Sequence, residues 1–133
     1  MSAPTAQAER VTCPEARNRV RSMLQPLCEK LPARRADQLR QDACLVTSEL
    51  ITNAMLHGGG VSDFDAHVDD QVLTVRVSDH STAPPRRLPR APERAGGFGW
   101  SIVRHLSSHV DVALGDEGKT VTVTLDAARL PAP

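Results

Sequence analysis

Three polar residues recur one helical turn apart in the segment "SELITNAMLHGGG", residues 48–60: Glu49, Asn53 and His57. Residues four positions apart project from the same side of a helix. A carboxylate such as Glu49 can accept a proton from a hydroxyl, and the amide oxygen of Asn53 can ligand a hard cation such as Mg²⁺. The same residue types more commonly mark a solvated helix face, so the segment alone leaves both readings open.

Two further segments carry residues that could contact a ligand. Asp79 ends the segment "VLTVRVSD", where it could accept a hydrogen bond from an amine such as that of adenine, or simply start a turn. The glycines of "GGFGW", residues 96–100, could bring backbone N–H groups against phosphates at a helix N-terminus, or form an ordinary turn. No Lys and Ser/Thr pair follows these glycines, which excludes a P-loop.

Two helices are expected to position these residues. Thr12 and Glu15 form a capping box for a first helix, which Pro26 should kink or shorten. Residues 30–38 are expected to be a connector. Apolar residues at spacings of three and four then predict a second helix from about Ala36 to His57, ended by the glycines at 58–60.

Alternating segments predict four strands around a long loop. Residues 64–68 and 72–79 form a hairpin through "DDQ", and residues 110–114 and 120–125 form a second pair, with a short helix after the glycines. Between them, residues 80–94 are rich in proline and arginine, and such long loops tend to be functional lids or disordered segments. We expect one domain of α+β class over residues 1–133, a two-layer α/β sandwich with a mixed, mostly antiparallel sheet and loose ends at 1–11 and 127–133.

Composition excludes several classes of protein. The formal net charge is zero, so binding of nucleic acid has no electrostatic support. Cys13, Cys28 and Cys44 are odd in number and fit free thiols better than a disulfide framework. No apolar run is long enough to cross a membrane, and no signal peptide is evident, which predicts a cytoplasmic protein.

In combination and in this order, the motifs resemble those of the Bergerat-fold (GHKL) ATPases, the group of gyrase, Hsp90, histidine kinases and MutL, and in particular the small bacterial anti-sigma serine kinases. "SELITNAMLHG" resembles the N-box, "VSDHSTAPP" the G1 box and "GGFGWSIVRHL" the G2 box, while "GKTVTVTL" resembles the closing strand. The likeness covers roughly residues 12–126 and implies a Bergerat fold with a long ATP lid, binding ATP and Mg²⁺.

The resemblance implies a role for each matched position. Glu49 would be the general base, Asn53 the ligand of Mg²⁺, and Asp79 the acceptor for the adenine amine. His57 would lie within reach of the pocket, although a histidine at a helix end beside the C-terminal dipole explains it equally. Thr120 would approach the adenine from the last strand.

The glycine-rich motif and the G1 box complete the expected nucleotide contacts. The backbone around Gly97 and Gly99 would meet the phosphates. Ser81, Phe98 and Trp100 are also expected to contact the nucleotide. Three positions depart from the family pattern: Ser81 stands where many members have glycine, Trp100 where leucine is usual, and Ala95 where the lid has an outer glycine. Trp100 would lie at the pocket mouth or in the core, and these departures bear on nucleotide affinity more than on fold.

Three functions remain from the sequence. The first histidine is His57, so a complete sensor kinase with an upstream phosphoacceptor histidine is not expected. The resemblance implies a kinase that phosphorylates serine or threonine on an anti-anti-sigma-type partner and sequesters a sigma factor, with a homodimer left open. A nucleotide-gated binding module with little turnover is the alternative, and a plain ATP hydrolase is third.

Overall fold

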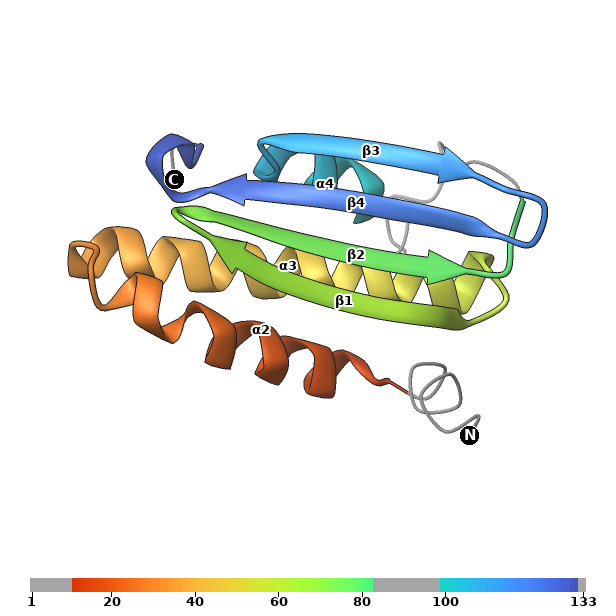
Figure 1. The fold of residues 1–133 in the computed structure, drawn as a ribbon, viewed down its shortest axis with the longest axis horizontal. Helices are drawn as coiled ribbons and strands as arrows, with labels where there is room; N and C mark the ends of the chain where they lie inside the picture. Colours follow the sequence, from red (N-terminus) through yellow and green to blue (C-terminus); the bar gives the residue numbers. More distant parts are fainter. Residues whose placement is uncertain (1–10, 83–98, 132–133) are drawn as a thin grey trace.

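Alternating apolar residues build a four-stranded sheet that carries the helices on one face (Figure 1). The computed structural model describes residues 11–82 and 99–131 of the 133-residue chain. The described elements run in the order α2 (Cys13–Cys28), α3 (Ala33–His57), β1 (Val61–Asp69), β2 (Val72–Asp79), α4 (Gly99–Leu106), β3 (His109–Leu114), β4 (Lys119–Asp126) and the 3₁₀ turn η2 (Ala127–Arg129). This is the predicted α+β, two-layer sandwich.

The described strands pair in the order β1-β2-β4-β3, and every pair is antiparallel. The expected hairpin forms through Asp70 and Gln71, and Asp70 adopts the left-handed conformation with φ of 58°. Every second residue of β2 and β4 is buried, from Leu73 to Asp79 and from Lys119 to Leu125. Because alternate side chains point to opposite faces, the residues between them lie on the face away from the helices.

The helices begin close to their predicted positions, with one difference. The capping box of α2 is formed as expected: Thr12 Oγ1 accepts from the Glu15 N–H, and the Glu15 carboxylate accepts from the Thr12 N–H. Pro26 is exposed and lies two residues before the helix ends at Cys28. The connector is shorter than predicted, because α3 begins at Ala33, directly after its N-cap residue Pro32.

The predicted loose ends are ordered at their inner boundaries. Val11 is buried, and Ala127 is buried with its N–H donating to Gln71 O at 2.8 Å. The end of the chain is held further by Gln38, whose side-chain amide donates to Pro131 O. Most of the predicted lid at 80–94, together with Ala95, lies outside the described residues.

Two further features concern the cysteines and the hydropathy of the helices. Cys13, Cys28 and Cys44 are all free thiols. Among the described helices, none is long and apolar enough to span a membrane.

Candidate functional site

The C-terminal half of α3 brings two of the predicted site residues to one position beside the core. Glu49 and Asn53 are half-buried, while Leu50 and Ala54 beside them are buried and fix the orientation of the helix. His57 is the last residue of α3 and is exposed. Glu49 and Asn53 therefore form the polar edge of a packed helix.

Glu49 lies against the start of α4. A Cβ atom added at Gly99 would overlap the Oε1 atom of Glu49, so the carboxylate occupies the space that any larger residue would need. Burial raises the pKa of the Glu49 carboxyl above the usual range for glutamate. The first turn of a helix leaves N–H groups without intrahelical acceptors, so this carboxylate sits beside a favourable place for negative charge.

Asp79 is held rigidly at the end of β2. Its side chain is 5% exposed, with Oδ2 accepting from Lys119 Nζ at 2.5 Å and Oδ1 accepting from the Ser81 N–H at 2.9 Å. Gly58 packs so closely that an added Cβ would overlap the Asp79 carboxylate, and Gly118 does the same against the Asp79 carbonyl oxygen. Asp79 is thus a fixed, buried hydrogen-bond acceptor.

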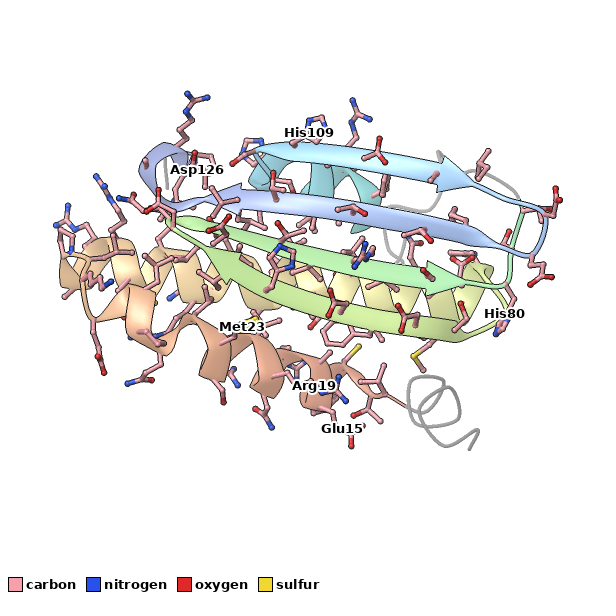
Figure 2. The ribbon with its side chains drawn as sticks, viewed as in Figure 1. Glu15, Arg19, Met23, His80, His109 and Asp126 are labelled. Atoms are coloured by element: carbon pink, nitrogen blue, oxygen red, sulfur yellow. The ribbon has the colours of Figure 1, made fainter. Side chains whose placement is uncertain are left out.

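One backbone hydrogen bond joins the end of α3, which carries Glu49 and Asn53, to the end of β2, which carries Asp79. The His80 N–H donates to Gly58 O at 2.8 Å, which ties the end of α3 to the end of β2. In Figure 2 His80 marks this end of the sheet, opposite the end marked by Asp126. The N-box residues and Asp79 therefore lie at the same end of the molecule.

The structure does not bring Thr120 together with Asp79. Thr120 pairs across the strands with Ser78, and their hydroxyl oxygens are 2.7 Å apart on the sheet face away from the helices. Lys119 is the residue opposite Asp79, and it was missed by the sequence analysis. The alternation of "KTVTVTL" carried the signal, because Lys119 has the same parity as the inward residues Val121 and Val123.

The structure describes only some of the G2-box residues. Gly99 and Trp100 open α4, and Trp100 is half-buried and packs against the core. Gly97 and Phe98 lie outside the described residues. Ser81 reaches the site through its N–H, which donates to Asp79.

The donor set limits how a magnesium ion could be held. In the described part of the chain, no group of three or more His, Cys, Asp or Glu residues could hold a metal ion. Magnesium in phosphoryl-transfer sites usually takes one or two protein ligands, with substrate phosphates and water completing its shell. A single amide oxygen from Asn53, together with nucleotide phosphates, fits this pattern.

Comparison with known proteins identifies the family. A model of the histidine kinase-like ATPase domain matches residues 7–125. The chain belongs to this family. Family membership confirms the resemblance to the GHKL group and supports binding of ATP, for which Mg²⁺ is the usual companion. No curated protein sequence matches the chain.

Solved structures of this family share the fold. The chain is similar to the histidine kinase AdeS of Acinetobacter baumannii, with 16% identity, a TM-score of 0.50 and coverage of 68% of this chain and 48% of that one. It is also similar to the histidine kinase domain of the Erythrobacter litoralis EL346 blue-light activated histidine kinase, with 24% identity, a TM-score of 0.51 and coverage of 68% and 46%. The chain therefore spans about half the length of these histidine kinases.

Proposed function

We propose that this chain is a protein serine/threonine kinase of the anti-sigma type, using ATP and Mg²⁺. A hydroxyl of an anti-anti-sigma-type partner attacks the γ-phosphorus, the bond to the β–γ bridging oxygen breaks, and ADP leaves. Glu49 accepts the proton of the hydroxyl. The same protein sequesters a sigma factor in the cytoplasm and has no nucleic acid partner, and a homodimer is left open.

The contact between Glu49 and Gly99 carries the proposal. It sets a carboxylate with a raised pKa beside the first turn of α4, where phosphate oxygens are favoured by free N–H groups. A carboxylate with a raised pKa takes a proton from a hydroxyl more readily than an exposed glutamate does. A protein that only bound nucleotide would gain nothing from burying a carboxylate there.

The other end of the proposed nucleotide lies at Asp79. Its buried carboxylate still has lone pairs beyond those used by Lys119 and Ser81, so it can accept from the adenine amine. Asn53 lies one turn from Glu49 and would be a ligand of the Mg²⁺ ion that neutralises phosphate charge. The proposed order along the nucleotide is therefore Asp79 at the base, Asn53 at the metal and Glu49 at the γ-phosphate.

The test separates binding from transfer. The partner is co-purified from the native cell, incubated with the chain and γ-labelled ATP, and the label is checked for the acid stability of phosphoserine and phosphothreonine. Glu49→Ala should bind ATP normally by calorimetry yet transfer phosphate about 10²–10⁴-fold more slowly. Asn53→Ala should lose the Mg²⁺-dependent part of binding. Transfer by Glu49→Ala at the wild-type rate would show that the mechanism is wrong.

A second candidate is a nucleotide-gated binding module with little turnover. Met55 and Leu56, 56% and 65% exposed, place two apolar side chains on the last turn of α3. Replacing both with serine should weaken binding of the co-purified partner, whereas Leu114→Ser, at a position 53% exposed on β3, should not. Loss of partner binding without any phosphorylation in wild type would favour this module.

A further inference from the structure

Lys119 is a buried cation at the proposed base-binding position. It is 6% exposed, and lysine is almost never buried unless it is paired. It stands directly across from Asp79 in the register of β2 and β4, and both side chains point to the helix-covered face. The ion pair therefore forms part of the interior at the end of the sheet that carries the site.

The described residues around this pair do not fill its hydrogen-bonding capacity. An ammonium has three donors, and a carboxylate offers about four acceptor positions. Within residues 11–82 and 99–131, the Lys119 ammonium donates to Asp79, and the carboxylate accepts from Lys119 and the Ser81 N–H. Buried donors without acceptors are unfavourable, so a ligand acceptor beside Asp79 would complete the ammonium's contacts.

We propose that Lys119 is a base-contacting residue that determines nucleotide specificity together with Asp79. This role of Lys119 rests on the proposed function, in which Asp79 accepts from the 6-amine of adenine. Lys119 donates to N1, the ring nitrogen next to that amine. The pair thus presents an acceptor beside a donor, which complements the donor and acceptor of the adenine edge.

The charges of the pair explain why both residues are needed. A lone buried carboxylate would face the lone pair of N1 with no donor between them, whereas the ammonium supplies that donor and neutralises the carboxylate. Guanine offers a carbonyl oxygen at position 6, which would oppose the acceptor of Asp79. The pair therefore favours ATP over GTP without a negative charge at the base.

The experiment measures binding of three nucleotides by calorimetry, with no turnover required. In 1-deaza-ATP a C–H replaces N1, while 7-deaza-ATP keeps N1 and the amine and serves as the matched control. Wild type should bind 1-deaza-ATP about 10- to 100-fold more weakly than ATP, as expected for loss of a hydrogen bond to a charged group, and 7-deaza-ATP nearly as well as ATP.

Two variants assign the effect to Lys119. In Lys119→Met the preference for ATP over 1-deaza-ATP should disappear. Because this change leaves a buried carboxylate without its cation, the double variant Lys119→Met/Asp79→Asn provides a neutral pair whose amide oxygen still accepts from the amine. It should also bind ATP and 1-deaza-ATP equally well.

The outcomes separate the two proposals. Equal binding of ATP and 1-deaza-ATP by wild type would overturn the role of Lys119 while leaving ATP binding intact. A preference for ATP that persists in the double variant would do the same, because another group would then contact N1. Absence of ATP binding by wild type would instead refute the proposed function, and the role of Lys119 with it.

Discussion

The close packing of Gly58 against the Asp79 carboxylate gives the sharpest prediction, the substitution Gly58→Ala. Gly58 has φ of −111° and ψ of 4°, a backbone conformation available to alanine, so no strain is expected from the main chain. The added Cβ would instead overlap Oδ2, Cγ and Cβ of Asp79. Overpacking of this kind typically costs about 1–3 kcal/mol of folding free energy.

The same overlap should displace the Asp79 carboxylate from its two donors, Lys119 and the Ser81 N–H. If Asp79 accepts from the adenine amine, a displaced carboxylate loses that bond, worth about 1–3 kcal/mol. At about 1.4 kcal/mol per tenfold change, Gly58→Ala should weaken ATP binding by roughly 5- to 150-fold. Calorimetry measures the affinity, and urea unfolding measures the stability.

Gly59→Ala is the matched control. Gly59 has φ of +75°, so alanine there is strained by about 1–2 kcal/mol, yet its Cβ would lie at an ordinary 3.5 Å from His80 Cβ. Gly59→Ala should be less stable than wild type. Measured at a temperature where both variants are folded, its ATP affinity should equal that of wild type. Wild-type affinity in Gly58→Ala, or an equal loss in Gly59→Ala, would refute the placement of the base at Asp79.

Three further predictions follow from neighbouring contacts. Glu49→Gln should raise the melting temperature at pH 7. The raised pKa of Glu49 means that the wild-type protein loses stability as the pH rises above the ordinary glutamate value of about 4.3, and glutamine avoids this loss. Near pH 4 the variant and the wild type should therefore melt at similar temperatures. Thr120→Val should leave ATP affinity unchanged by calorimetry, since Thr120 contacts Ser78 on the far face; a tenfold loss would contradict this. Gly118→Ala should lower the urea midpoint, because its Cβ would overlap the Asp79 carbonyl oxygen; an unchanged midpoint would count against that packing.

Local patterns predicted most of the fold because each is set by neighbouring residues. The capping box at Thr12 and the alternation around Val75 and Val123 determine helix start and strand face without knowledge of distant contacts. The start of α3 was misplaced by about three residues, because Arg34 and Arg35 were assigned to a polar connector although arginine is a good helix former.

The sequence predicted which site residues lie together when they share one helix. It did not predict the contacts between residues on two different strands. Glu49 and Asn53 share one helix, so their spacing alone places them together. The pairing of Asp79 with Lys119 depends on the register between β2 and β4, which are separated in sequence by α4 and β3. The sequence offered Thr120 as the nearer match to the family motif, and only the observed register shows which residue of β4 faces the carboxylate.

The contacts around Asp79 also connect the fold to the function. Its carboxylate is confined by Gly58 at the end of α3, and its backbone is confined by Gly118 before β4, while Lys119 neutralises the buried charge. Breaking such a pair by removing one partner is strongly destabilising, because a buried charge is left uncompensated. The end of α3, β2 and β4 must therefore dock together before the carboxylate is held in place. A base-binding acceptor built in this way forms only when the helical layer and the sheet have packed, which makes its geometry a consequence of the same contacts that stabilise the fold.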